Sequence, residues 1–279
     1  MDQIETVNLV PKFLEFYQKA DREAVDAEER WALWQEYYGF AAVPPGDEGQ
    51  QMARQLLDDN WEHYQENIEA IRNWTPNHEQ IEQHLSDIKQ LLGYEQPIHL
   101  VVIYFVGGFE GNPFVAPYDE ERHALCLPIE TELSSITLYH ELTHIVHSKT
   151  ANFSLTWERP IASTIMQEGL ATRVSQYMVP GLLDEDYIEI EDGWLKTCES
   201  KRADILEGIY PYLDDASSEV LMKFLFGKGT TNTEREAYYA GWEIVNTLLA
   251  QGKTFKDIAS VQESDLSRYI RDVYPALKQ

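Results

Sequence analysis

The spacing of apolar residues divides the chain into three parts. Over residues 2–38, 47–74 and 77–92, apolar side chains return every three to four positions, which is the repeat of an amphipathic helix. The tryptophans and tyrosines of these stretches are expected to form a core rather than to bind a ligand. The first part, residues 1–95, is therefore predicted to be a helical N-terminal region that packs on the rest of the protein.

The second part has the pattern of β-strands. Residues 98–106 form a run of β-branched and aromatic side chains that ends at Gly107, and residues 123–128 form a shorter apolar run. Both runs predict strands of a small sheet. Because Pro128 cannot donate a hydrogen bond to a neighbouring strand, residues 124–127 are expected to lie at the edge of the sheet. An extended peptide can pair with such an edge.

The third part returns to helical spacing. Residues 136–146, and a segment that begins near Pro160 and ends before Pro180, have the pattern of helices. The connection over residues 149–159 is long enough for the second helix to fold back antiparallel to the first. Further helices, one of them over residues 233–249, follow toward the C-terminus. The fold class is therefore predicted to be α+β and mainly helical.

Composition and charge exclude several classes of protein. The formal net charge of -26 argues against a nucleic-acid partner, whose phosphates attract Lys and Arg. The acidic surplus indicates either a solvated surface or a negative cleft that attracts cationic peptides. No apolar stretch is long enough for membrane insertion, and the first residues lack the basic and apolar segments of a secretory signal. Since the only cysteines are Cys126 and Cys198, we expect a cytoplasmic protein without disulfides.

One motif of the third part has the pattern of a catalytic metal site. His140-Glu141-Leu142-Thr143-His144 has the His-Glu-x-x-His spacing of zinc hydrolases. Four residues are slightly more than one helical turn, so His140 and His144 project from one face of a helix and can hold one metal ion. Glu141 would lie beside the metal, where its carboxylate can take a proton from a zinc-bound water. The motif therefore indicates zinc-dependent hydrolysis.

A catalytic zinc site takes three protein ligands and leaves the fourth position to water, so a third ligand is needed. Glu168, in the second predicted helix, can face both histidines if that helix folds back on the first. His147 is the rival ligand, because it follows His144 on the same helix. Three side chains from one helical stripe converge poorly on one point, so His147 is expected to support the ligands or to be an ordinary helix-face histidine. We therefore expect His140, His144 and Glu168 to bind one zinc ion.

These residues resemble those of a known group of enzymes. The His140-to-His144 motif and the later Glu-Gly-Leu-Ala segment that begins at Glu168 look like the gluzincin metallopeptidases, which include thermolysin and the zinc aminopeptidases. Together with the run of residues 237–242, they look most like the uncharacterised YjaZ-like family of predicted zinc-dependent proteases. The likeness covers roughly residues 98–249.

The resemblance implies a fold and a division of the chain. It implies a zincin core of the thermolysin type, with a small mixed sheet before the zinc-binding helix. Residues 96–279 would form the metallopeptidase domain, with the sheet over 96–130, the active-site helices over 131–180 and a helical C-terminal part over 181–279. Many gluzincins have an Asp four residues after the ligand Glu to orient a histidine, whereas this chain has Thr172.

The resemblance also points to two further residues. Hydrolysis needs a donor to the oxyanion that forms on the scissile carbonyl. Tyr238, or else Tyr239, is expected to supply it, and the likeness favours Tyr238. Residues 107–112 faintly resemble the segment with which zinc aminopeptidases hold the substrate's free amino group, with Phe109 in place of a Met. Glu110 is therefore either an amine-binding residue or part of a polar connection between strands.

The sequence thus predicts a zinc metallopeptidase that acts on peptide or protein substrates, with His140, His144 and Glu168 as its metal ligands. Its catalytic residues would be Glu141 and Tyr238. Endopeptidase and aminopeptidase activity are not distinguished. Two other functions stay open: a zinc-binding regulatory or interaction protein without proteolysis, and a helical binding module whose motif helix is only part of the core. Bound zinc without hydrolysis would favour the first, and absence of metal would favour the second.

Overall fold

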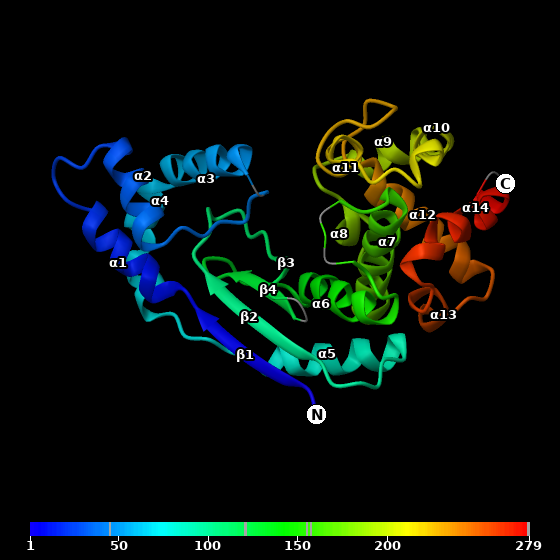
Figure 1. Cartoon of the computed structure of the whole chain (residues 1–279), viewed down its shortest axis with the longest axis horizontal. Coiled ribbons are helices and arrows are strands. Elements are labelled where there is room, and N and C mark those ends of the chain that lie inside the picture. The colour runs from blue at the N-terminus through cyan, green and yellow to red at the C-terminus, as the bar shows by residue number, and fades with distance from the viewer. Residues whose placement is uncertain (45, 120–121, 155, 157, 278–279) are drawn as a thin grey trace. The chain divides into compact units, whose positions relative to one another are not determined.

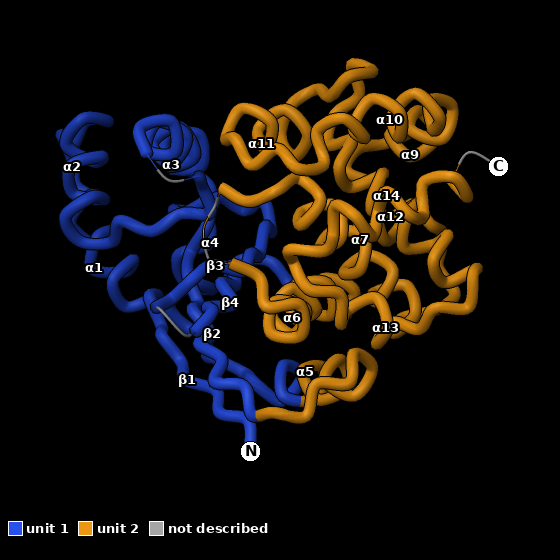
Figure 2. The backbone as a smooth tube through the Cα atoms, turned by 45° about the vertical axis from the view of Figure 1, so that its right-hand side comes forward, with its two compact units in different colours: residues 1–82, 97–134 blue, residues 83–96, 135–279 orange. Residues whose placement is uncertain are grey.

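The computed structural model describes residues 1–44, 46–119, 122–154, 156 and 158–277. Leu155 and Trp157 of the predicted interhelical connection, and the last two residues of the predicted C-terminal part, lie outside these ranges. The described fold is α+β and mostly helical with one small mixed sheet, as predicted (Figure 1). The chain forms two compact units, of which unit 1 is Met1–Glu82 with Pro97–Ser134 and unit 2 is Gln83–Gln96 with Ser135–Gln279 (Figure 2).

Unit 1 contains the sheet and the first four helices. The helices are α1 (Val10–Ala20), α2 (Ala27–Tyr37), α3 (Asp47–Asp59) and α4 (Trp61–Asn73). The strands are β1 (Gln3–Asn8), β2 (His99–Phe105), β3 (Phe114–Pro117) and β4 (His123–Pro128). The predicted helical stretch over residues 47–74 is therefore two helices, which meet at Asn60.

The sheet has the strand order β1-β2-β4-β3. β1 and β4 flank β2 in parallel, and β3 pairs antiparallel with β4. Every residue of β2 after His99 is buried, as expected for the continuous apolar run of a central parallel strand. Val101, Ile103 and Phe105 of β2 pack with Ala124 and Cys126 of β4 in one apolar cluster, so the two predicted strands form the centre of the sheet.

Two expectations about the sheet are wrong. Residues 3–8 form strand β1 rather than the start of a helix, and their β-branched Ile4, Thr6 and Val7 favour a strand once β2 is available as a partner. Residues 124–127 lie inside the sheet, because β3 pairs with the free side of β4. Pro128 is the last residue of β4, where a missing N–H costs little. Of the described strands, β1 and β3 are the edges.

The aromatic residues of the N-terminal helices form a core, as predicted. Phe13 of α1 contacts the rings of Tyr38 at 5.3 Å and Tyr64 at 5.1 Å in edge-to-face geometry. Trp34 and Phe16 are buried in the same cluster. Because β1 also ties the N-terminus to the sheet, the strands of residues 96–130 fall in the same unit as α1 to α4. The predicted metallopeptidase domain over residues 96–279 thus includes parts of both units.

Unit 2 is helical in its described residues. Its longer helices are most of α5 (Glu79–Leu92), α6 (Ser135–Thr150), α7 (Ile161–Met178), α12 (Glu236–Ala250) and α14 (Leu266–Leu277). The shorter ones are α8 (Glu185–Ile188), α9 (Trp194–Ser200), α10 (Arg202–Ile209), α11 (Ser218–Leu225) and α13 (Phe255–Ala259), with 3-10 turns η1 (Tyr210–Tyr212) and η2 (Glu263–Asp265). Figure 2 shows α7 within this unit, where it packs against both α6 and α12.

Helix α7 is fixed at its start by hydrogen bonds and along its length by burial. Pro160 precedes α7, whose first residues are fixed by hydrogen bonds from Ile161 N–H to the Asp215 carbonyl and from Ala162 N–H to the Leu213 carbonyl. α7 is buried along most of its length, so it forms the centre of the unit. Packing on several sides, rather than one amphipathic face, therefore holds this helix in place.

Two further expectations can be compared with the described residues. Among them, no helix has both the length and the apolar composition that crossing a lipid bilayer requires. Cys126 and Cys198 are buried and form no disulfide in the described structure, as predicted.

Candidate metal centre

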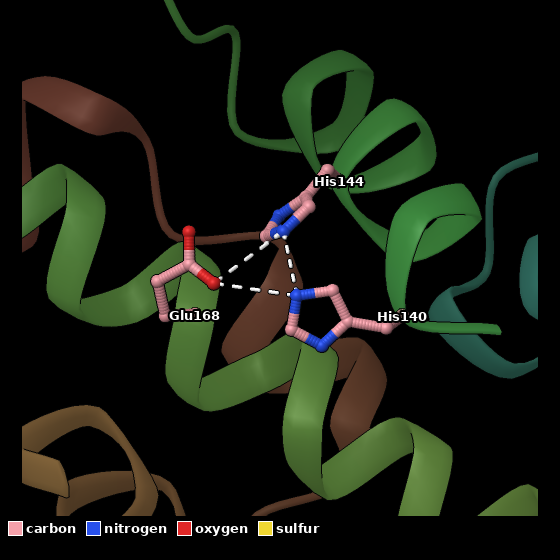
Figure 3. Close-up of side chains that lie close together, drawn as sticks. All are labelled: His140, His144 and Glu168. Atoms are coloured by element: carbon pink, nitrogen blue, oxygen red, sulfur yellow. Dashed lines mark hydrogen bonds and ion pairs between the residues drawn. The ribbon is translucent and has the colours of Figure 1, made fainter. Parts of the chain in front are cut away.

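α6 and α7 carry the three predicted metal ligands. His140 and His144 lie one turn apart on α6, and Glu168 lies near the middle of α7. Because the two helices pack against each other, the three side chains point toward one another (Figure 3). Two residues of the group thus come from local helical spacing, and the third comes from the packing of a second helix.

The three donor atoms converge on one point. The Nε2 atoms of His140 and His144 are 3.1 Å apart. The Oε2 atom of Glu168 lies 3.3 Å from the first and 3.5 Å from the second (Figure 3). Two ligands about 2.0–2.1 Å from a tetrahedral zinc ion lie roughly 3.3–3.4 Å from each other. The spacing of the donors therefore fits a metal ion of that size and geometry.

The three side chains are mostly buried, and each keeps a small part of its surface exposed. The side chains of His140, His144 and Glu168 keep 19%, 14% and 13% of their surface exposed. Among the described residues, no fourth His, Cys, Asp or Glu joins the group. A bound metal would therefore keep a coordination position for water, which is the arrangement of catalytic rather than structural zinc sites.

The ligand carboxyl is held in its charged form. Burial by itself raises the pKa of Glu168, but the charges of His144 and His140 and their hydrogen bonds outweigh it and hold the pKa well below its ordinary value. A carboxylate that stays ionised is available as a metal ligand over the whole physiological pH range.

Glu141 has a different environment from Glu168. Its side chain is buried, with 9% of the residue exposed. Burial raises the pKa of Glu141 to about 7, while His140 lowers it and the Glu168 charge raises it further. A carboxyl group that gains and loses a proton near neutral pH is suited to general acid–base chemistry.

Of the two candidate tyrosines, only Tyr238 is electrostatically coupled to this group. Both residues lie in the first turn of α12. Burial raises the pKa of Tyr238, and the charges of Glu168 and Glu141 raise it further, so the phenol keeps its proton. Tyr239 is buried with its ring 6.4 Å from that of Trp194, in an apolar cluster. It therefore belongs to the core of the unit.

Two glycines bring the helix of Tyr238 close to the helix of Glu168. A Cβ atom on Gly169 would lie 2.3 Å from the carbonyl carbon and oxygen of Gly241, and one on Gly241 would lie 2.2 Å from the Ile165 carbonyl oxygen. α7 and α12 therefore approach backbone to backbone, which only glycine permits. Gly169 follows Glu168, and Gly241 is one turn after Tyr238, so this contact sets the distance between ligand and phenol. Sequence reasoning missed it, although a glycine inside a helical pattern often signals close packing.

A buried carboxylate fixes the loop before α12. Glu236, which is fully buried, accepts hydrogen bonds from the N–H and hydroxyl groups of both Thr230 and Thr231. The preceding Arg235 has a left-handed backbone with φ 51° and ψ 43°. This conformation is uncommon for a residue other than glycine and persists where the surroundings determine it. The start of α12, and with it Tyr238, is thus held in one conformation.

His147 does not join the metal ligands. It is fully buried, its ring lies 4.8 Å from that of Phe153, and neither ring nitrogen has a hydrogen-bond partner among the described residues. Burial, followed by the charges of His144 and Arg159, lowers the pKa of His147 to about 3. The structure thus places it as a neutral buried histidine that makes no hydrogen bond to the predicted ligands among the described residues.

Thr172 and Glu110 are the two other residues for which the sequence suggested a role at the site. The hydroxyl of Thr172 donates to the carbonyls of Glu168 at 2.8 Å and Gly169 at 3.1 Å, so it bonds to its own helix and orients neither histidine. Glu110 belongs to unit 1, where it is exposed in the connection after β2. Its role toward a substrate amine stays a prediction.

No family model matches the chain, and no curated protein or solved structure matches it either. The resemblance to gluzincins therefore stays an expectation from the motif residues of the sequence.

Proposed function

We propose that this protein is a zinc-dependent peptide hydrolase of the gluzincin type. The observation that carries the proposal is the convergence of His140, His144 and Glu168, whose donor atoms are 3.1–3.5 Å apart. Imidazole nitrogens with one carboxylate oxygen are a donor set that zinc prefers over magnesium or calcium. The resemblance to the YjaZ-like family and a zincin core of the thermolysin type belong to the same proposal.

Zinc held by these three residues would supply a water of lowered pKa and would polarise the scissile carbonyl. Glu141 is the general base, because its carboxyl follows His140 directly and its burial, which raises its pKa, favours uptake of a proton that it can pass to the leaving amine. Tyr238 keeps its proton and donates a hydrogen bond to the oxyanion. Each role follows from the position and charge of a side chain.

The substrate and setting are proposed from the whole chain. Peptides or proteins are the substrates, since an open group of this kind serves attack on an amide carbonyl. Nucleic acid is disfavoured as a partner by the net charge of -26. A cytoplasmic location is proposed from the small number of cysteines.

The first test is the substitution of Glu141 by Gln, which keeps the shape of the side chain but removes the base. Zinc-loaded Glu141→Gln should retain its metal and lose roughly 10²–10⁴-fold in kcat against a mixed peptide library, the usual contribution of a general base. Glu219→Gln, an exposed change on α11, is the matched control and should retain full activity.

Two results would contradict the proposal. If Glu141→Gln cleaved peptides at the wild-type rate, Glu141 would not be the base. If the wild type bound one zinc ion and cleaved no peptide of the library, the alternative of a non-proteolytic zinc-binding regulatory or interaction protein would replace the hydrolase.

A further inference from the structure

The arginines of unit 2 differ in their partners. Arg202, Arg268 and Arg271 each form an ion pair with a carboxylate, as expected in a chain with 48 acidic and 22 basic residues. Arg159 and Arg235 do not: among the described residues, neither guanidinium has an ion pair or a hydrogen bond. Each instead lies over an aromatic ring.

Arg159 lies just before α7, the helix that carries Glu168. Its Cζ atom is 5.7 Å from the centroid of the Phe153 ring, a cation–π contact that supports the guanidinium from one side. Burial lowers the pKa of Arg159, and the charges of Glu263 and Glu168 counteract this, although neither carboxylate is within ion-pair distance. The Arg159 charge also acts on His147 of α6, so this cation is close to both ligand helices.

Arg235 lies just before α12, the helix that carries Tyr238. Its Cζ atom is 5.7 Å from the centroid of the Tyr238 ring, and Tyr238 is itself coupled to Glu168 and Glu141. The left-handed backbone of Arg235 and the loop held by Glu236 fix the point from which this side chain extends. The position of the cation is therefore set by the fold.

The two arginines share a geometry that suits an anionic ligand. A guanidinium supported by an aromatic face keeps the N–H groups at its edge available, and these match the two oxygens of a carboxylate. An unpaired arginine in so acidic a chain is unusual, and here one lies just before the helix of Glu168 and the other lies over the ring of Tyr238. A carboxylate of a bound ligand would have the chemistry to pair with each guanidinium, which has no such partner among the described residues.

We propose that Arg159 and Arg235 are specificity-determining residues that select peptides with a carboxylate near the scissile bond. The inference depends on the proposed hydrolase function and adds the substrate class. The carboxylate is either the C-terminus of the peptide or the side chain of an Asp or Glu. It is the opposite of the cationic peptides that a negative cleft would attract.

The test compares peptides that differ only in this charge. One pair has a free or an amidated C-terminus, and a second pair has Glu or Gln near the cleaved bond. For the wild type we expect kcat/KM at least ten-fold higher for the acidic member of one pair, and the pair that responds identifies the source of the carboxylate. In Arg159→Met or Arg235→Met this ratio should fall toward one, mainly through KM, while Arg159→Lys should recover part of it.

Controls separate this inference from folding and from the hydrolase function. Arg268→Met removes an exposed arginine of the same unit and should keep the wild-type ratio, and each variant should retain bound zinc and its helical circular dichroism. Peptide hydrolysis with equal kcat/KM for both members of both pairs would overturn the inference and leave the hydrolase intact.

A binding measurement decides the case in which no peptide is cleaved. Calorimetry on zinc-loaded Glu141→Gln should give a lower Kd for the acidic peptide than for its neutral match. The difference in Kd between the two peptides should be lost in the double variant that carries both Glu141→Gln and Arg159→Met. Equal affinity for both peptides would overturn the inference whatever the activity.

Discussion

At the scale of single residues, His144 and His147 of α6 have opposite environments although only two residues separate them. The Nε2 atom of His144 faces Glu168 at 3.5 Å, whereas both nitrogens of His147 are buried without a described hydrogen-bond partner. A buried imidazole without an acceptor cannot carry a proton at acceptable cost. His147 is therefore a neutral core residue that the fold tolerates only while it stays unprotonated.

This environment predicts a dependence of stability on pH. The folded-state pKa of His147 is about 3, below the ordinary value of about 6.5 that applies in the unfolded chain. The unfolded state therefore takes up a proton first as the pH falls below about 6.5, so stability is complete above that pH and is lost toward pH 3. For this one group, the loss between pH 7.5 and pH 5 is about 2 kcal/mol.

His147→Leu removes the group with little change in volume, so its free energy of unfolding should fall less between these pH values than that of the wild type. Urea unfolding of metal-free protein at both pH values measures the difference, and the other titrating groups are common to both proteins. An equal fall in both would contradict the buried, neutral state of His147. The His147→Leu variant should also keep bound zinc. A variant that lost its zinc would indicate that His147 is a metal ligand.

At the scale of elements, the contact between α7 and α12 determines whether Tyr238 is near the ligands. Glu168 lies on α7 and Tyr238, the proposed oxyanion donor, lies on α12. The spacing of the two helices therefore determines the distance between these two residues. Gly169 and Gly241 reduce that spacing by removing both side chains from the contact. The contact thus has a functional consequence beyond stability.

Gly241→Ala tests this consequence. The new Cβ would lie 2.2 Å from a backbone oxygen, which no side-chain rotation can relieve, so α12 must move away from α7. We expect a loss of about 1–3 kcal/mol in stability. In the folded fraction we expect zinc content near the wild-type value with a large drop in kcat, because the ligands lie on α6 and α7 while Tyr238 moves.

Asn246→Ala changes an exposed position of the same helix and should alter stability by no more than about 0.5 kcal/mol, with kcat unchanged. Thermal unfolding, metal analysis and peptide turnover measured on the same preparations distinguish these effects. A Gly241→Ala protein with wild-type kcat would contradict the role of the contact.

At the scale of the whole molecule, the sequence predicted what depends on local geometry. His140 and His144 share a helical face because of their spacing alone, and Glu168 required only that a second helix fold back. β1 was missed because its partner is distant in the chain, with Gln3 opposite His99. The edge of the sheet was wrong for a different reason: β3 is close to β4 in the chain but has only four residues, and its pattern was not recognised as a strand.

The residues that surround the metal group were least predictable. Gly169 and Gly241 meet across two helices, and the partners of Arg159 and Arg235 are aromatic rings that no local pattern identifies. Each of these contacts depends on how separate helices pack in unit 2. Sequence spacing carries no information on such packing, so it indicated the proposed metal ligands but not the residues that we propose to position or select a substrate.

The central claim is that three side chains hold one catalytic zinc ion, and metal content tests it most directly. Protein purified without added metal or chelator should contain about one zinc per chain by mass spectrometry, and Glu168→Ala should contain much less. Glu158→Ala, an exposed change just before α7, is the control and should keep the wild-type content. A wild-type protein that binds no zinc even when zinc is supplied would contradict the account and leave the motif helix as part of the core.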